Sequence, residues 1–420
     1  MRSSPLWFVL AGFMILLDFY FFQVVKTLSN HAGPKTRSII FISYWSISIL
    51  ALLVLFILPF LHLDNYSRSV RSTIFAIIIG LFLSKLIGSV FFLVDDIRRF
   101  IQWLVSKVFF KNTEGEQMSG GGISRSVFIS WLGVAVSGTL FGSLLYGFSN
   151  KYNYQVKKLK LNYPNLPAAF KGLKVLQISD IHSGSFSNKK AVLKGVDKAL
   201  ALNPDIILFT GDLVNDRVEE MENYTDVFNR LQAPMGVYSI LGNHDYGDYF
   251  WGRHPSGLEA LEKEDNMRRL KKLQADMGWK LMLDENVILK RGEDQIALIG
   301  IQNWSALKNF PKYGNLPKAY AGTEQIPFKI LMSHDPTHWD AEVRPKFGDI
   351  DLMLAGHTHG FQFGVEIPGF RWSPVQYVYK QWAGLYEEGA QKLYVNQGFG
   401  FIGYPGRVGI LPEITLIELT

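Results

Sequence analysis

The chain has 420 residues, no cysteine and a net charge of +6, and 48% of its residues are hydrophobic. The length allows two or three domains, and the lack of cysteine excludes disulfides, zinc-finger sites and thiol catalysis. Residues 1–150 hold 12 Lys and Arg against 6 Asp and Glu, whereas the rest of the chain holds 31 of each kind. Because the basic excess lies between long apolar runs, it indicates contact with membrane lipid and not with nucleic acid.

Four apolar stretches are long enough to cross a bilayer as helices, which takes about 20 residues each. They are Pro5–Val25, Ser38–Leu61, Ser72–Val94 and Ser126–Phe148. We therefore predict a membrane domain over residues 1–150 with four transmembrane helices, in a bacterial inner membrane. Between the third and fourth stretches, Asp95–Phe110 has apolar residues at helical spacing and basic residues on the opposite face. This pattern predicts a helix in the membrane interface; the alternative is an extension of the third span into the cytoplasm.

Two charged residues fall inside these stretches. Asp18 lies 13 residues after Pro5, and Lys85 lies 13 residues after Ser72. Both helices enter the membrane from the same side, so the two side chains reach a similar depth. Because an unpaired charge in the bilayer is costly, we predict an ion pair between them. The alternative is a path for protons or ions, which a single pair of charges supports poorly.

The basic residues give opposing signals about orientation. An even number of spans places the N-terminus and residues 151–420 on the same side of the membrane. The first span and the basic third loop favour the exoplasmic side for both, whereas Lys151, Lys157, Lys158 and Lys160 favour the cytoplasmic side. We predict, by a narrow margin, an exoplasmic second half.

Residues 151–172, with Pro164 and Pro167, are predicted to form a connector. In residues 173–420, strand-like and helix-like segments alternate at first, and strands dominate towards the end. The predicted helices are 188–201, 217–231 and 258–277, and the predicted strands are 175–179, 206–210, 237–241, 280–283, 296–301, 328–332, 352–354, 393–395 and 414–419. This order predicts an α/β domain of two packed sheets flanked by helices, an αββα arrangement.

Five short polar blocks lie in this second half, and four of them follow strand-like runs directly. They are Asp180-Ile181-His182, Gly211-Asp212, Gly242-Asn243-His244-Asp245, Ser333-His334-Asp335 and Gly356-His357-Thr358-His359. Ligand sites of open α/β sheets lie at the carboxyl ends of strands, so the blocks should meet at one edge. Asp, His and Asn without Cys form a mixed oxygen and nitrogen set that suits two divalent metals. A single Asp or His would more commonly be a helix cap or a core residue, but five histidines within the blocks argue against that interpretation.

In their order and spacing, the blocks resemble the signature D-x-H, G-D, G-N-H-[D/E], H, G-H-x-H of the calcineurin-like metallophosphoesterases, over about residues 170–420. The resemblance implies a first metal held by Asp180, His182, Asp212 and His359. It implies a second metal held by Asp212, Asn243, His334 and His357, with Asp212 as the bridge. Mn, Fe and Zn all fit these ligands. Two such metals can share a hydroxide and place it in line with a phosphorus atom.

The resemblance gives His244 a role outside the metal shells, that of protonating the leaving oxygen. Asp245 would orient His244 or cap the following segment. The sequence departs from the family pattern at two positions. Asn215 stands where phosphoprotein phosphatases have a second Asp, which disfavours a protein phosphatase. Phe361 stands where membrane-associated bacterial relatives often have Gly.

Residues 246–255 carry four aromatic side chains between glycines. They would form either a mobile lid over a lipid or sugar, or a plug packed on the domain. Within and beyond this segment, Arg253, His254 and Arg407 are candidate contacts for a substrate phosphate. A surface salt bridge is the commoner role of an isolated arginine.

These observations predict a membrane-anchored metal-dependent phosphoric ester hydrolase. Its substrate would carry a phosphodiester or pyrophosphate on an amphiphilic, lipid-linked molecule, because four spans hold the site near the bilayer. A narrower hypothesis is the UDP-2,3-diacylglucosamine pyrophosphatase of lipid A synthesis, whose cytoplasmic substrate an exoplasmic domain would exclude. Two further hypotheses belong to different classes. One is a non-catalytic membrane scaffold with a relict phosphoesterase domain, which the complete ligand set opposes, and the other is a transporter with a regulatory domain.

Overall fold

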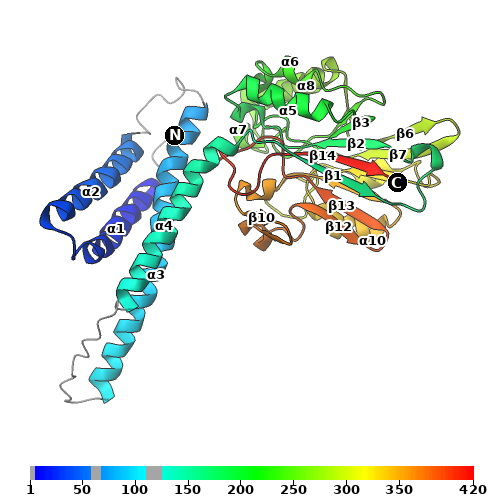
Figure 1. Ribbon diagram of the computed structural model, residues 1–420. Coiled ribbons are helices and arrows are strands. Elements are labelled where there is room, and N and C mark those ends of the chain that lie inside the picture. Colours follow the sequence, from blue (N-terminus) through cyan, green and yellow to red (C-terminus); the bar gives the residue numbers. More distant parts are fainter. Residues whose placement is uncertain (1–4, 58–67, 110–124) are drawn as a thin grey trace. The chain divides into compact units, whose positions relative to one another are not determined.

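The computed structural model describes residues 5–57, 68–109 and 125–420. These divide into two compact units, one ending at Tyr146 and the other beginning at Gly147. The first unit consists of long helices, and the second contains two six-stranded sheets (Figure 1).

The helices of the first unit are α1 (Pro5–Leu28), α2 (Pro34–Ile57), α3 (Arg68–Phe109) and α4 (Arg125–Asn150), the last of which continues into the second unit. Each is long and apolar enough to cross a membrane. Many of their large apolar side chains are exposed, for example Leu16, Ile42 and Phe128. Surfaces of this kind are typical of contact with lipid. The prediction of four membrane-spanning helices is thereby confirmed.

The predicted ion pair inside the spans is also confirmed. Nζ of Lys85 on α3 lies 2.5 Å from Oδ1 of Asp18 on α1, and both side chains are buried. Ser48 on α2 joins the pair, because its hydroxyl donates to Asp18 at 3.0 Å and accepts from Lys85 at 2.7 Å. The hydroxyl of Tyr44 adds a bond to the carbonyl oxygen of Asp18 at 2.8 Å. Three helices are therefore tied together by one polar cluster.

The predicted interfacial helix over Asp95–Phe110 is wrong as a separate element, although Phe110 itself lies outside the described residues. The segment is the continuation of α3, a single helix of 42 residues. At 1.5 Å per residue this helix is about 63 Å long, roughly twice the hydrocarbon thickness of a bilayer. The segment lacks proline and glycine, and Asp95 accepts from Arg98 one turn later at 2.7 Å. The helix therefore has no local reason to break where the apolar run ends.

The first sheet of the second unit has the strand order β1-β14-β2-β3-β4-β5. Its strands are β1 (Gln155–Leu161), β2 (Lys174–Ile178), β3 (Ile206–Phe209), β4 (Val237–Ser239), β5 (Trp279–Leu281) and β14 (Glu413–Leu419). All neighbours are parallel except β14 and β2. The predicted connector 151–172 is therefore corrected in part, because β1 within it pairs with the C-terminal strand along its whole length.

The second sheet has the order β12-β13-β9-β8-β7-β6. Its strands are β6 (Glu285–Arg291), β7 (Asp294–Gly300), β8 (Lys329–Met332), β9 (Leu352–Ala355), β12 (Gly384–Glu388) and β13 (Gln391–Val395). A separate two-stranded ribbon is formed by β10 (Val365–Ile367) and β11 (Phe370–Trp372).

The longer helices of this unit are α5 (Lys189–Leu200) and α8 (Gly257–Asp276), close to the predicted bounds. The predicted helix 217–231 is wrong in extent, since it consists of two single turns, η5 (Val218–Met221) and α6 (Thr225–Phe228). The other short helical elements are η3 (Ala168–Phe170), η4 (Ser183–Ser185), α7 (Asp248–Trp251), α9 (Leu316–Tyr320), η6 (Trp339–Val343), α10 (Arg344–Lys346), η7 (His359–Gln362) and η8 (Pro374–Tyr377).

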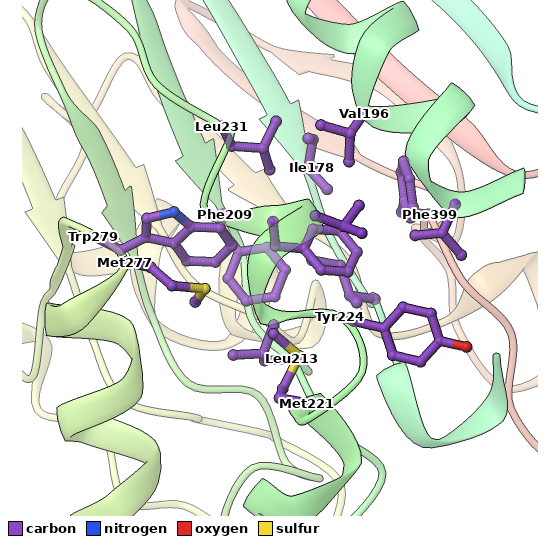
Figure 2. Close-up of a cluster of buried hydrophobic side chains, with 14 of the residues drawn as sticks. Ile178, Val196, Phe209, Leu213, Met221, Tyr224, Leu231, Met277, Trp279 and Phe399 are labelled. Carbon is purple, nitrogen blue, oxygen red and sulfur yellow. The ribbon is translucent and has the colours of Figure 1, made fainter. Parts of the chain in front are cut away.

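Three hydrophobic clusters show how these layers pack. One joins the inner faces of the two sheets, for example Val175 of the first and Ile330 of the second. Another fills the space between the first sheet and its helices, where Phe209 and Ile178 meet Val196 of α5 (Figure 2). A third covers the outer face of the second sheet. The four layers confirm the predicted αββα fold and fix the strand ends that carry the polar blocks.

Candidate metal centre

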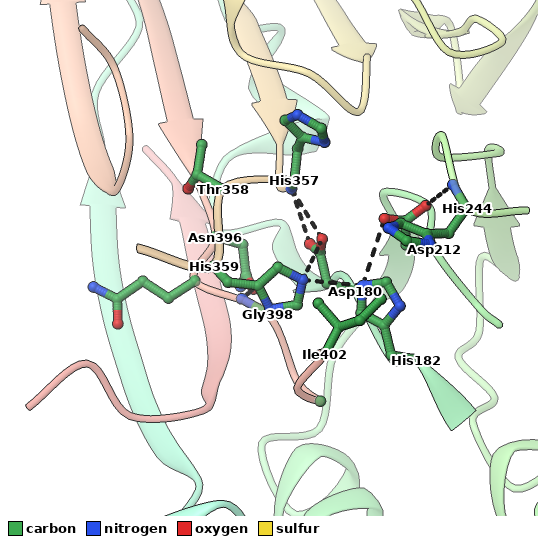
Figure 3. Close-up of polar contacts among 12 residues, drawn as sticks. Asp180, His182, Asp212, His244, His357, Thr358, His359, Asn396, Gly398 and Ile402 are labelled. Atoms are coloured by element: carbon green, nitrogen blue, oxygen red, sulfur yellow. Dashed lines mark hydrogen bonds and ion pairs between the residues drawn. The ribbon is translucent and has the colours of Figure 1, made fainter. Parts of the chain in front are cut away.

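The polar blocks meet at the carboxyl ends of five strands. Asp180 and His182 follow β2, Asp212 follows β3, Asn243 and His244 follow β4, His334 follows β8, and His357 and His359 follow β9. The parallel registers of β2–β3–β4 and of β8–β9 bring these ends to one edge of the two sheets. The seven predicted ligands come from both sheets and lie together, as Figure 3 shows for several of them.

Asp180, His182 and His359 form one group of potential ligand atoms, all within 4.8 Å of one another. Nε2 of His182 lies 3.0 Å from Nε2 of His359, which lies 3.2 Å from Oδ1 of Asp180 (Figure 3). Oδ2 of Asp212 is 3.5 Å from Nε2 of His182. These four residues are the ones predicted for the first metal.

The residues predicted for the second metal form a looser group around Asp212. Oδ2 of Asp212 lies 3.1 Å from Nε2 of His334, and Asp180, Asp212 and His334 form a second group of potential ligands within 4.8 Å. Oδ1 of Asn243 lies 2.7 Å from Nδ1 of His357. Asp212 lies near His182 of the first group and near His334 of the second, and Asp180 belongs to both groups of potential ligands.

The chemistry of this donor set fits divalent cations. The carboxylates of Asp180 and Asp212 are buried, and so are the rings around them. Burial lowers the pKa of His182, His357 and His359, which keeps these rings in the neutral form that binds metals. Burial also opposes the charge of His334, but the neighbouring Asp212 carboxylate raises its pKa to about 10. The carboxylate thus favours a positive charge at that position, and a bound cation would supply it.

The backbone of the site is strained. Five of the predicted ligands have a positive φ: Asp180 (53°), His182 (48°), Asp212 (62°), His357 (74°) and His359 (51°). Such conformations are uncommon for residues other than glycine, and they concentrate at functional sites. The tight turns after each strand therefore aim the side chains at a common point at a cost in conformational energy.

Main-chain carbonyl groups fix two of the histidine rings. Nδ1 of His334 donates to the carbonyl oxygen of Thr210 at 2.7 Å, and Nδ1 of His244 donates to that of Asn215 at 2.8 Å. A carbonyl oxygen can only accept, so the proton must be on Nδ1 and Nε2 is available to the site. Asn215, which departs from the protein phosphatase pattern, therefore acts on His244 through its backbone. Its side chain pairs with the hydroxyl of Ser185 at 3.0 Å.

Asp245 neither orients His244 nor caps the segment that follows it. Its carboxylate accepts from the main-chain nitrogens of four residues, Asp212, Leu213, Val214 and Gly242, at 2.8–3.2 Å. It therefore joins the turns after β3 and β4, from which Asp212 and Asn243 project. This structural role replaces both roles that the sequence suggested for Asp245.

The structure contradicts the predicted substrate contact of Arg407. Its side chain is 0% exposed. One guanidinium nitrogen donates to the carbonyl oxygen of Gln397 at 2.8 Å, and the other donates to that of Gly400 and lies 3.2 Å from Nδ1 of His359. Arg407 is thus enclosed behind a predicted metal ligand and braces its main chain, because it also donates to the carbonyl oxygen of His359 at 3.3 Å.

Arg253 and His254 lie apart from the metal residues. They line a cavity of about 860 Å³ against α8, together with residues such as Leu261 and Lys271. Arg253 donates to the carbonyl oxygen of Asn309 and lies 3.9 Å from the carboxylate of Asp248. Neither residue lines the cavity that contains the metal residues.

The aromatic segment 246–255 is packed on the domain. Tyr246 is buried, and its hydroxyl accepts from the nitrogen of Asn303 at 3.2 Å. The ring of Tyr249 stacks on His244 with centroids 4.4 Å apart, and its hydroxyl accepts from Asn243 at 3.0 Å. These contacts favour the packed plug for Tyr246 and Tyr249, whereas Phe250 is 55% exposed.

Two residues of the site were not found from the sequence. Tyr249 contacts His244 and Asn243, and the hydroxyl of Tyr379 lies 2.8 Å from Nε2 of His357. Tyr249 falls in the aromatic segment 246–255, which the sequence marked as unusual without assigning a role to any of its aromatic residues. Tyr379 lies on no strand and beside no motif, so its part in the site depends on the tertiary fold alone.

A cavity of about 450 Å³ opens beside the metal residues. Its polar lining consists of His182, Asp212, Asn243, His244, His357 and His359. Its apolar lining includes Phe310, Phe361, Val375, Val378 and Ile402. Phe361 has a φ of 59°, so the position that often holds glycine in relatives does require a left-handed backbone. Its ring points outward and is 63% exposed.

Comparisons with known proteins match both units. Residues 1–151 match the family model described as "Probable Calcineurin-like phosphoesterase, transmembrane domain", and residues 173–361 match the one described as "Calcineurin-like phosphoesterase". A zebrafish protein, "Transmembrane protein with metallophosphoesterase domain", is 30% identical over 275 residues, which are 63% of this chain and 57% of that protein. The chain thus spans little more than half of that relative's length.

Two bacterial relatives are matched over more of their length. The "Uncharacterized metallophosphoesterase YkuE" of Bacillus subtilis is 27% identical over 308 residues, covering 71% of this chain and 98% of that protein. The "UDP-2,3-diacylglucosamine pyrophosphatase LpxG" of Chlamydia trachomatis is 27% identical over 292 residues, covering 59% of this chain and 83% of that protein.

Proposed function

Because the chain belongs to the calcineurin-like metallophosphoesterases and carries their four-helix membrane domain, we propose that it binds two divalent metal ions and hydrolyses phosphodiester or pyrophosphate bonds of an amphiphilic, lipid-linked substrate. The observation that carries the proposal is the convergence of the seven predicted ligand residues at the ends of five strands, with five of them in a left-handed backbone conformation.

The ligand sets are those that follow from the signature. Asp180, His182, Asp212 and His359 would hold the first ion, and Asp212, Asn243, His334 and His357 would hold the second. When bound, two such ions supply Lewis-acid stabilisation of phosphoryl charge and activation of water. Imidazole, carboxylate and amide ligands suit Mn, Fe or Zn.

His244 is the proposed general acid. Its ring lines the cavity beside the metal residues, and the bond from Nδ1 to the carbonyl oxygen of Asn215 leaves Nε2 available to a leaving group. Stacking on Tyr249 keeps the ring in place. A proton held at Nε2 would neutralise the oxygen that departs from phosphorus.

The substrate class is inferred from the cavity and from the anchor. Apolar side chains, including Phe310, Val375 and Val378, line the same cavity as the metal residues. A pocket with few convergent polar groups and an apolar lining favours a ligand with a phosphate and an apolar part. Four spans keep the chain in a membrane, where such molecules are concentrated.

Hydrolysis of bis-p-nitrophenyl phosphate by the full chain with added Mn²⁺ tests the enzyme proposal. Asp212→Asn should lower the rate at least about 100-fold, because it weakens the ligand shared by both ions. Asp276→Asn, an exposed change on α8, is the matched control and should keep the wild-type rate. Equal rates for the wild type and Asp212→Asn would instead favour the non-catalytic scaffold.

A second candidate is UDP-2,3-diacylglucosamine hydrolysis, which the similarity to the Chlamydia trachomatis protein favours. It requires a cytoplasmic catalytic domain, whereas we propose an exoplasmic one in a bacterial inner membrane. Alkaline phosphatase fused after Thr420 decides between them, because it is active only when exported. An active fusion would eliminate the UDP-lipid candidate, and an inactive fusion at normal expression would reverse the proposed orientation.

A further inference from the structure

The two-stranded ribbon β10–β11 has one apolar face and one polar face. Val365 pairs with Trp372 and Ile367 pairs with Phe370, so these four side chains project to the same side. Glu366 and Arg371, which pair with each other, project to the opposite side. The apolar side is largely exposed, since Ile367 is 58% and Phe370 is 54% exposed, whereas Trp372 is half-buried. On the polar side, Arg371 is also exposed in part.

The polar face is bonded to the rest of the domain. Glu366 accepts from Lys157 of β1 at 3.0 Å and from Gln397 at 3.1 Å. Arg371 donates to the carbonyl oxygen of Ala383 at 2.6 Å. These bonds hold the ribbon in one orientation, with its apolar face outward. A one-residue change of register would exchange the two faces, so the outward direction of the apolar side chains depends on the register of the ribbon.

Further exposed apolar side chains lie just before and just after the ribbon, on η7 and at the end of η8, and these two short helices contact each other. Phe361 is 63% exposed, Tyr377 is 77% exposed and Val378 is 64% exposed. Phe361 and Val378 also line the metal cavity. We call the ribbon side chains Val365, Ile367, Phe370 and Trp372, together with these three, the apolar ribbon surface. Contiguous exposed apolar surfaces mark contacts with membranes, proteins or ligands.

Two observations favour a lipid bilayer as the partner. The turn between the strands is Ile367-Pro368-Gly369-Phe370, an apolar tip where exposed loops are normally polar. The base of the ribbon also adjoins the point where the chain enters this unit. Phe363 forms a bridge with Val408, and the neighbouring nitrogen of Arg407 donates to the carbonyl oxygen of Gly147 at 2.9 Å. Gly147 lies in the last turns of α4, a helix that can span the membrane.

We propose that the apolar ribbon surface inserts into the interfacial acyl region of the membrane in which the chain is anchored, and so holds the mouth of the metal cavity at the lipid surface. Amphipathic elements bind membranes in this way, with the apolar face among the acyl chains and the polar face towards water. The insertion itself does not depend on the catalytic proposal. Its consequence for lipid substrates rests on that proposal.

The absence of cysteine in the chain permits a direct test, because one introduced cysteine is unique. Phe370→Cys would carry an environment-sensitive fluorophore in the full chain, reconstituted in nanodiscs with nitroxide-labelled lipids. Leu16→Cys on α1 is the lipid-exposed reference, and Lys272→Cys on α8 is the solvent-exposed reference. We expect quenching at position 370 to approach that at position 16 and to exceed that at position 272 several-fold.

Quenching at position 370 equal to that at position 272 would overturn the proposal. Shielding of position 370 from both lipid nitroxides and a water-soluble quencher would also overturn it, because a protein, such as a second copy of the chain, would then cover the surface. Neither outcome depends on activity, so a failure of the catalytic proposal leaves this test intact.

A functional test uses Ile367→Asp combined with Phe370→Asp. These side chains lie outside the metal cavity, so hydrolysis of bis-p-nitrophenyl phosphate should stay at the wild-type rate. Hydrolysis of a phosphodiester lipid presented in vesicles should fall at least about ten-fold, because the charged ribbon no longer enters the bilayer. Equal losses on both substrates would contradict the proposed membrane role and indicate a damaged domain.

Discussion

Nδ1 of His244 donates to the carbonyl oxygen of Asn215 at 2.8 Å, and this bond leaves Nε2 as the ring nitrogen available to the metal cavity. His244→Gln should therefore slow hydrolysis by about 100- to 10,000-fold, the range typical of a lost general acid. The loss should be larger for an alkyl ester than for a p-nitrophenyl ester, because the poorer leaving group needs the proton more.

Rates of the two esters, measured for the wild type and His244→Gln, check this prediction. His254→Gln is the matched control, because His254 lies in a different cavity and should have no effect. The same loss on both esters would show that His244 does not protonate the leaving group.

Arg407 should be a positioning residue for His359. Its guanidinium donates to the carbonyl oxygen of His359 at 3.3 Å and to those of Gln397 and Gly398 in the turn that packs behind the ring. Arg407→Met should weaken metal binding by about 10- to 100-fold, which is typical when a group that orients a metal ligand is lost. It should also lower the melting temperature, since several buried carbonyl groups lose their donors.

Competition with a chelator measures the metal affinity, and thermal unfolding measures the stability. Arg407→Lys keeps the charge but has fewer donors, and should fall between Met and the wild type. Arg253→Met is the control, because Arg253 is partly exposed and lines a different cavity. A metal affinity unchanged in Arg407→Met would refute the positioning role.

The ion pair of Asp18 and Lys85 should stabilise the membrane unit. Removing one partner leaves the other charge buried, which costs about 3–5 kcal/mol. Asp18→Asn and Lys85→Met should each lower the melting temperature in detergent, and the double variant should recover much of the loss. A double variant as unstable as the sum of the single variants would contradict the pairing. Lys35→Gln, at an exposed site on α2, serves as the control.

Much of the site could be predicted from the sequence because its residues follow buried strands closely. Asp180, Asp212 and His357 each come within three residues of a strand end, so the position of the strand fixes that of the side chain. The position of Tyr379 could not be predicted in this way, because Tyr379 lies in an irregular segment and follows no strand. The sequence also did not reveal that Arg407 is buried. An arginine after Pro-Gly has the same sequence pattern whether its side chain faces solvent or packs behind the metal-binding residues.

The membrane unit shows a different limit. Apolar length predicted the four spans, and the matching depth of Asp18 and Lys85 predicted their contact. The end of the third apolar run was interpreted as the end of the helix, and this was wrong. The sequence changes from apolar to charged at Asp95, but the helix continues through this point. The Asp95 carboxylate accepts a hydrogen bond from Arg98 one turn later, so these polar side chains are accommodated within the helix. Likewise, β1 was missed because its lysine-rich sequence lacks the apolar pattern of a central strand, and it forms the edge of its sheet.

The proposed two-metal centre can be tested by counting the divalent ions bound per chain. Elemental analysis of the full chain, purified after incubation with Mn²⁺ and removal of free metal, should give about two ions for the wild type and for Asp276→Asn. Asp212→Asn, which removes a charge from the shared ligand, should retain at most about one. A wild-type protein that hydrolyses bis-p-nitrophenyl phosphate while holding no divalent ion would contradict the proposed metal-dependent hydrolysis.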